Sequence, residues 1–295
     1  MEAKKIKING FNLQVYFWGI PDNPKLFLFH GWMDSGASFH FICELLKKNF
    51  YCIAPDLRGF GQSDHTSNPL GYYFLDYLTD VQQLLEYFDS PEKARVLGHS
   101  MGGNLLSLYC GIFPKSASHF INIEGLGPQG HPPQEIIPRI QKWLKQINSF
   151  EMERGFRWYN NEDEIANRLQ MANPQLILKR AKFLIPFLSK KKGKQLQFNA
   201  DPKHKWIHPY IIPLEQYEAC WKNISAKCLF IIGENTDFKS YFRSTLSAEE
   251  EVKRRLKNFP VGIKKHVVKG AGHMIHHEKP RELANIVEKF LQEKD

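Results

Sequence analysis

The stretch RVLGHSMGGN, residues Arg95–Asn104, places one serine between glycines where two different patterns meet. The residues before it, KARVLGH, are an apolar run typical of a short buried strand, and those after it, NLLSLYCGIF, are typical of a buried helix. Gly98 and Gly102 leave room for a strand to turn at once into a helix, with Ser100 at the turn. The pattern G-x-S-x-G therefore predicts a nucleophilic serine. The alternative is a turn serine that serves only local hydrogen bonding.

Strand and helix patterns alternate on both sides of this turn. A hairpin is expected over residues 4–18 around Asn9-Gly10. Buried strands are expected in KLFLF, FYCIAP, SHFINIE, AKCLFIIG and KKHVV, and helices in residues 72–88, 247–259 and 280–291. This alternation predicts an α/β protein with a mostly parallel, doubly wound β-sheet that helices cover on both faces.

The alternation stops after Glu124 and resumes near residue 216. The intervening residues are rich in proline and lysine and contain several helix-like pieces. We therefore expect a core formed by residues 1–126 and 216–295, with residues 127–215 as a helical cap inserted at the carboxyl edge of the sheet, where open α/β folds bind ligands.

Composition excludes several classes of protein. With 42% hydrophobic and 24% charged residues, the chain is typical of a globular protein. It contains no run of 18 apolar residues, and its start lacks the apolar region of a signal peptide, so a cytoplasmic protein without a transmembrane segment is expected. The five cysteines lack C-x-x-C spacing, which predicts reduced core thiols.

Positive charge is concentrated in the predicted cap. Residues 127–215 contain 15 Lys or Arg and 8 Asp or Glu, while the whole chain has a formal net charge of +9. A basic surface favours an anionic partner such as an acidic small molecule, and the alternative is a solvated charged face. Neither zinc-finger spacing nor an RNA-binding signature accompanies the charge, so no nucleic-acid partner is expected.

A serine nucleophile needs a base, and a third group must orient that base. His273, in KGAGHMIHHEKP, follows the last predicted strand and begins a turn at the same sheet edge as Ser100. His276 and His277 raise the question of a metal site, but no carboxylate or cysteine lies near them at ligand spacing. We therefore expect neither a metal nor a cofactor.

Four motifs in this order resemble the α/β-hydrolase fold family: HGW at His30–Trp32, DLRGFGQSD at Asp56–Asp64, GHSMGG at Gly98–Gly103 and GAGHMIHHEKP at Gly270–Pro280. The pieces EGLGP, RLQMANP and W-x-H-P also resemble the serine hydrolase-like branch of that family. The resemblance implies that Ser100 is the nucleophile and His273 the base. It also implies an oxyanion hole formed by the backbone N–H groups of Met101 and Trp32.

The acid departs from the commonest pattern of the family. That pattern places an aspartate where this chain has Thr236, and Asp237 follows one residue later. Glu124, at the end of the strand that follows the serine helix, is the second candidate, because some family members draw their acid from that strand. The sequence leaves both carboxylates open.

A serine at the turn, where related enzymes that open epoxides or remove halogens use an aspartate, favours acyl transfer to water. We therefore expect a serine hydrolase that forms an acyl-enzyme with an ester, thioester or lactone, on a small acyl substrate that could be anionic. Aromatic residues of the cap are candidates to line its pocket: Trp143, Phe150, Phe156, Trp158, Tyr159, Phe183, Phe187 and Trp206. The alternative is a ligand-binding protein that keeps the fold without efficient catalysis. The sequence leaves the oligomeric state open.

Overall fold

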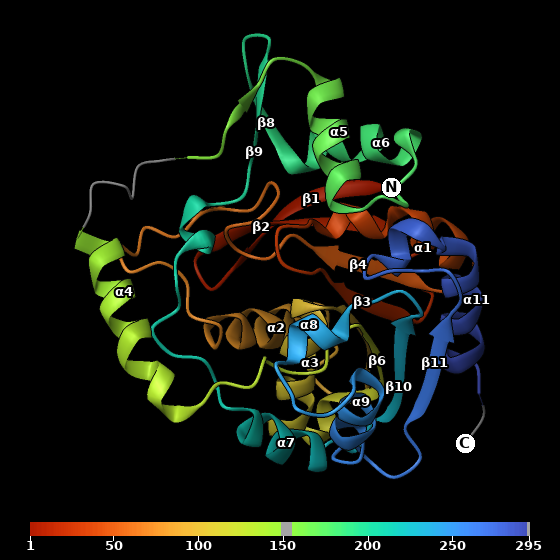
Figure 1. Cartoon of the computed structure of the whole chain (residues 1–295). Helices are drawn as coiled ribbons and strands as arrows, with labels where there is room; N and C mark the ends of the chain where they lie inside the picture. Colours follow the sequence, from red (N-terminus) through yellow and green to blue (C-terminus); the bar gives the residue numbers. More distant parts are fainter. Residues whose placement is uncertain (149–154, 294–295) are drawn as a thin grey trace.

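An eight-stranded sheet forms the centre of the molecule in the computed structural model, which describes residues 1–148 and 155–293 (Figure 1). The strand order is β1-β2-β4-β3-β5-β6-β10-β11. The strands are β1 (Glu2–Ile8), β2 (Phe11–Trp18), β3 (Lys25–Phe29), β4 (Tyr51–Pro55), β5 (Ala94–His99), β6 (Ala117–Ile123), β10 (Lys227–Gly233) and β11 (Lys264–Val268). β2 pairs antiparallel with β1 and with β4, and the other neighbouring pairs are parallel, which confirms the predicted sheet.

The first two strands form the predicted hairpin. Asn9 and Gly10 have φ values of 48° and 83° at its turn. Two consecutive residues with positive φ are typical of the type I′ turn, whose twist matches that of the strands it joins. The Asn-Gly pair therefore fixes the register in which Ile8 faces Phe11.

Helices cover both faces of the sheet. In β3, Phe27 and Phe29 pack into one apolar core and Leu26 and Leu28 into another, because successive side chains of a strand point to opposite faces. The first core also contains residues of α2 (Asp76–Tyr87), α3 (Met101–Ile112), α7 (Leu214–Lys222) and α9 (Ala248–Leu256). The second contains residues of α1 (His40–Leu46) and α11 (Pro280–Leu291). The doubly wound arrangement is thus confirmed.

Residues 127–215, which we call the insertion, follow β6, end within the first turn of α7 and add elements of their own. These are α4 (Ile136–Asn148), β7 (Trp158–Tyr159), α5 (Glu162–Ala172), α6 (Leu178–Leu188), β8 (Ser189–Lys192) and β9 (Gln195–Phe198). The three strands form a small antiparallel sheet. The insertion therefore contains strands as well as the helices that the sequence predicts. Figure 1 shows the β8–β9 hairpin beside α5 and α6, with α4 apart from them. The division into a core and a cap at residues 127 and 215 stays a prediction.

Two further features concern the cysteines and the length of the helices. All five cysteines are unpaired, and four of them are buried. Within residues 1–148 and 155–293, no helix has both the length and the apolar character that crossing a membrane requires.

Candidate active site

Ser100 lies at a sharp turn between β5 and α3. Its φ of 50° is rare for a residue with a side chain, so the turn holds Ser100 in a strained conformation. A Cβ atom on Gly102 would lie 2.1 Å from the Phe29 carbonyl oxygen, and one on Gly98 would lie 2.4 Å from the Gly102 carbonyl carbon. The two glycines are therefore required by close approach of the backbone, as the sequence pattern predicts.

The loop after β3 lies directly beside this turn. A Cβ atom on Gly31 would lie 3.3 Å from the Ser100 Cβ atom, which places the next residue, Trp32, close to the serine. Among the described residues, neither the Trp32 backbone N–H nor that of Met101 donates a hydrogen bond. Two free donors therefore lie beside Ser100, as an oxyanion hole requires.

His273 contacts Glu124. Its Nδ1 lies 3.3 Å from Glu124 Oε2, and the Glu124 side chain is fully buried while that of His273 is 46% exposed. The other carboxylate oxygen, Oε1, accepts hydrogen bonds from the Gly233 backbone N–H at 2.5 Å and from Thr236 Oγ1 at 2.8 Å. The carboxylate is therefore fixed from two sides and directed at the histidine.

Asp237 has a different role in the structure. It precedes α8 (Phe238–Phe242), where its carboxylate accepts hydrogen bonds from Ser240 N at 3.1 Å and Ser240 Oγ at 2.6 Å. These hydrogen bonds lower the pKa of Asp237. Of the two carboxylates that the sequence left open, the structure thus brings Glu124 to His273, while Asp237 is exposed at a helix start.

A tight turn places Glu124 at this edge of the sheet. Glu124 has a φ of 63°, directly after β6, and the Asn122 side chain bridges the turn through Gly125 N at 2.9 Å and Gly125 O at 2.5 Å. The neighbouring Ile123 carbonyl accepts a hydrogen bond from Ser100 N at 2.7 Å. The serine turn and the glutamate turn are therefore held together by backbone contacts, and Asn122 is a positioning residue that sequence reasoning missed.

A cavity of about 540 Å³ opens beside these residues. Trp32 and His273 line it, together with apolar side chains of the insertion that include Phe156 and Tyr159. Ser100 is not among the lining residues, and its hydroxyl makes no hydrogen bond in the part of the chain that the structure describes. Of the aromatic residues expected around an acyl pocket, Phe150 lies outside the described residues.

Three basic side chains of the insertion also line this cavity: Arg157, Arg168 and Lys205. All three are exposed, and no carboxylate of the described residues lies within ion-pair distance of them. Lys205 Nζ and the Arg157 guanidinium lie over aromatic rings, 3.6 Å and 5.3 Å from the ring centroids. The cavity therefore combines an apolar lining with three basic side chains that have no carboxylate partner in the described part of the chain.

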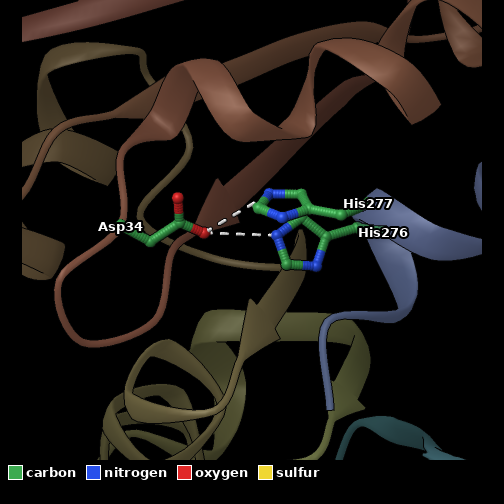
Figure 2. A group of neighbouring side chains, drawn as sticks. All are labelled: Asp34, His276 and His277. Carbon is green, nitrogen blue, oxygen red and sulfur yellow. Dashed lines mark hydrogen bonds and ion pairs between the residues drawn. The ribbon is translucent and has the colours of Figure 1, made fainter. Parts of the chain in front are cut away.

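A second polar group is buried next to His273: Asp34, His276 and His277 (Figure 2). Asp34 Oδ2 lies 3.2 Å from His276 Nε2 and 3.9 Å from His277 Nε2. Burial opposes the charge on Asp34, yet the hydrogen bond with His276 and electrostatic interactions with the surrounding histidines hold the pKa of Asp34 below the usual range. The spacing of residues around the two histidines gives no sign of this carboxylate, because Asp34 lies 242 positions before His276 in the chain.

Another buried carboxylate, Asp56, supports the loops around the site. It accepts hydrogen bonds from Ser35 Oγ at 2.6 Å, from Gly36 N at 2.7 Å and from Gln62 N at 2.7 Å. Burial raises the pKa of Asp56. Because these donors belong to the loops after β3 and β4, Asp56 ties the loop that contains Trp32 to the loop of the DLRGFGQSD motif. The motif is visible in the sequence, but this role is not.

Comparison with known proteins identifies the fold family. The sequence model described as the alpha/beta hydrolase fold matches residues 24–280. A serine hydrolase-like protein of Danio rerio is 24% identical over 281 residues, which cover 93% of this chain and 83% of the relative. Serine hydrolase-like protein 2 of Homo sapiens is 22% identical over 295 residues, which cover 98% and 93% of the two chains.

The solved structures include a thioesterase domain from the curacin biosynthetic pathway, which is 20% identical. It superposes with a TM-score of 0.86 and covers 98% of this chain and 99% of its own. At this level of identity, the likeness shows the fold alone.

Proposed function

Because this chain belongs to the alpha/beta hydrolase fold family, we propose that it is a serine hydrolase with Ser100 as nucleophile, His273 as base and Glu124 as acid. One observation carries the proposal. Among the described residues, Glu124 is the only buried carboxylate that contacts His273. It directly follows β6, and the last carbonyl of β6 accepts a hydrogen bond from the Ser100 backbone N–H. The proposed base, the proposed acid and the turn that contains Ser100 therefore lie at the same edge of the sheet.

In the proposed mechanism, Ser100 Oγ attacks the carbonyl carbon of an ester, thioester or lactone and gives its proton to His273 Nε2. Glu124 accepts the Nδ1–H hydrogen bond, which keeps Nε2 free to act as the base. The Trp32 and Met101 backbone N–H groups stabilise the oxyanion, and each donor of this kind contributes about 2.7 to 4 kcal/mol to the transition state. His273 then returns the proton to the leaving group, and water hydrolyses the acyl-enzyme.

We also propose that the substrate has an apolar acyl part and an anionic group. Apolar side chains of the cavity favour the acyl part. The positive charges of Arg157, Arg168 and Lys205, which pair with no carboxylate of the described residues, favour the anionic group. Five unpaired cysteines support a reducing compartment such as the cytoplasm.

Labelling with a fluorophosphonate probe tests the nucleophile and its acid together. We expect the folded wild-type chain to be labelled, Ser100→Ala to lose all labelling, and Glu124→Gln to slow it strongly. Asp237→Asn is the matched control, since Asp237 contacts Ser240 and not His273. A stronger effect of Asp237→Asn than of Glu124→Gln would contradict the assignment of the acid.

A second candidate function is ligand binding without catalysis. It is favoured by the Ser100 hydroxyl, which makes no hydrogen bond in the described chain and does not line the cavity. Absence of labelling in a chain whose circular dichroism shows that it is folded would support this candidate.

Paired substrates test the anionic group. Two esters with the same acyl chain, one ending in a carboxylate and one in a methyl group, are compared for kcat/KM at low and high ionic strength. Arg168→Gln is expected to reduce the preference for the carboxylate, whereas Lys192→Gln, at an exposed position of β8 outside the cavity lining, leaves it unchanged. Equal kcat/KM for the two esters at low ionic strength would remove this part of the proposal.

A further inference from the structure

Asp34, His276 and His277 form a cluster of potential metal ligands that the proposed mechanism does not use. Asp34 lies in the loop after β3, while both histidines belong to α10 (Ile275–Glu278). All three residues are buried, with at most 4% of each residue exposed. Figure 2 shows both imidazole rings directed at one oxygen of the carboxylate.

We propose that Asp34, His276 and His277 bind a divalent transition metal of the zinc type. An ion about 2.1 Å from each of its ligands places those ligands about 3 to 4 Å apart. Asp34 Oδ2 lies 3.2 Å and 3.9 Å from the two Nε2 atoms, and the ligand atoms of the three residues lie within 4.8 Å of one another. Two imidazoles and a carboxylate are a ligand set that zinc and related metals accept.

An unpartnered nitrogen points to a ligand independently of this geometry. His277 Nε2 is buried and has no hydrogen-bond partner among the described residues, and its distance to Asp34 is too long for a hydrogen bond. A buried polar atom without a partner costs free energy, so a ligand that binds it is favoured. The carboxylate ligand, Asp34, already accepts a hydrogen bond from Ser38 Oγ at 2.8 Å, which orients it.

The cluster has an entry path and a route to the predicted active site. Asp34 and His277 both line the cavity that also contains His273 and Trp32. On the other side of the cluster, the His99 ring lies 4.5 Å from the His276 ring and 4.8 Å from the His273 ring, measured between centroids. Binding moves the proton that lies between His276 Nε2 and Asp34 to His276 Nδ1, so that a neutral imidazole holds the ion through Nε2.

An added dication near His273 disfavours the imidazolium that forms when Ser100 attacks. The metal is therefore expected to inhibit acylation. This consequence rests on the proposed function, whereas binding of the metal does not.

Calorimetric titration of the full chain, without an affinity tag and after dialysis against a chelator, tests binding with Zn²⁺ alone. We expect one equivalent to bind, and His277→Gln and Asp34→Asn each to weaken the affinity at least about tenfold. Two controls remove exposed competitors: His266→Gln on β11 and Cys220→Ser, the cysteine that is not buried. Both are expected to bind Zn²⁺ as the wild type does, and circular dichroism establishes that each variant is folded.

No saturable binding by the wild type, or equal affinity in Asp34→Asn and His277→Gln, would overturn the site. Zn²⁺ is also titrated against the rate of fluorophosphonate labelling, which is expected to fall in the wild type but not in folded Asp34→Asn. Calorimetric binding to a chain that the probe never labels would sustain the metal site and reject the hydrolase. Labelling by the probe without calorimetric binding of Zn²⁺ would sustain the hydrolase and reject the metal site.

Discussion

At the scale of single residues, Thr236 explains how Glu124 can replace an acid from the neighbouring loop. Thr236 stands where the commonest family pattern has its aspartate, and here its hydroxyl donates to Glu124 Oε1 at 2.8 Å. The Gly233 N–H binds the same oxygen. The last residue of β10 and the loop after it thus supply donors that hold the proposed acid, which directly follows β6, and the second oxygen of that carboxylate contacts His273.

Removing the Thr236 hydroxyl is expected to loosen the acid without removing it. A hydrogen bond to a charged group contributes about 1.5 to 3 kcal/mol, and Thr236→Val loses this donor while it keeps the size of the side chain. We expect kcat/KM for an ester to fall by about tenfold, less than for Glu124→Gln, because the Gly233 N–H still binds the carboxylate. Steady-state kinetics measure this, with Thr236→Ser as the matched control that keeps the donor. Equal activity of Thr236→Val and Thr236→Ser would show that the hydroxyl has no positioning role.

At the scale of elements, the junction of β5 and α3 has no room for side chains beside Ser100. Both Gly98 and Gly102 face backbone atoms, which cannot move aside as the end of a flexible side chain can. The strained serine therefore depends on the packing of β3, β5 and α3 against one another.

Gly102→Ala is expected to destabilise the whole fold, because its new methyl group meets the Phe29 carbonyl at 2.1 Å. Overpacking of this kind costs about 1 to 3 kcal/mol or more, which urea denaturation followed by circular dichroism measures. Gly130→Ala is the matched control, since the nearest atom to its Cβ would be 3.7 Å away. A free energy of unfolding that is the same in both variants would contradict this account of the turn.

Elements whose signals are local were predictable from the sequence. The Asn9-Gly10 hairpin and the strand-serine-helix turn each depend on residues within a few positions, and the structure contains both. The β8–β9 hairpin was not predicted, because SKKKGK has the composition of a solvated loop and only pairing with QLQF makes it a strand. Composition alone therefore does not predict a strand that forms only because it pairs with a neighbouring strand.

The contacts of the site depend on distant parts of the chain. Glu124 meets His273 across 149 positions, and Asp34 meets His276 across 242. The sequence identified the serine, the histidine and two candidate carboxylates, since each ends or follows a strand. It could not choose between the carboxylates, because that choice depends on which side chain the two loops orient toward the histidine.

At the scale of the whole molecule, a histidine joins the insertion to the core. The His204 ring lies between two aromatic rings that precede the insertion, with centroids 3.8 Å from Phe60 and 3.9 Å from Tyr72. Burial lowers the pKa of His204 to about 3. A neutral imidazole is therefore part of the interface that holds the insertion on the sheet.

This interface predicts loss of stability in acid. An unfolded histidine binds a proton below pH about 6.5, whereas folded His204 stays neutral until about pH 3. Between these values the unfolded state binds more protons, so the free energy of unfolding falls as the pH is lowered. Each such histidine contributes a slope of up to about 1.4 kcal/mol per pH unit, and His277, whose pKa burial also lowers to about 3, adds to the effect.

His204→Gln removes one titrating group from the interface and keeps a polar side chain there. Urea denaturation between pH 7 and pH 4.5 is expected to show that the free energy of unfolding of this variant depends less steeply on pH, with a slope smaller by the equivalent of up to one bound proton. The variant also loses ring stacking, so it is expected to be less stable at pH 7. His266→Gln, at an exposed position on β11, is expected to keep the wild-type slope. If His204→Gln also keeps that slope, the interface does not hold His204 neutral, and the acid sensitivity must come from other groups.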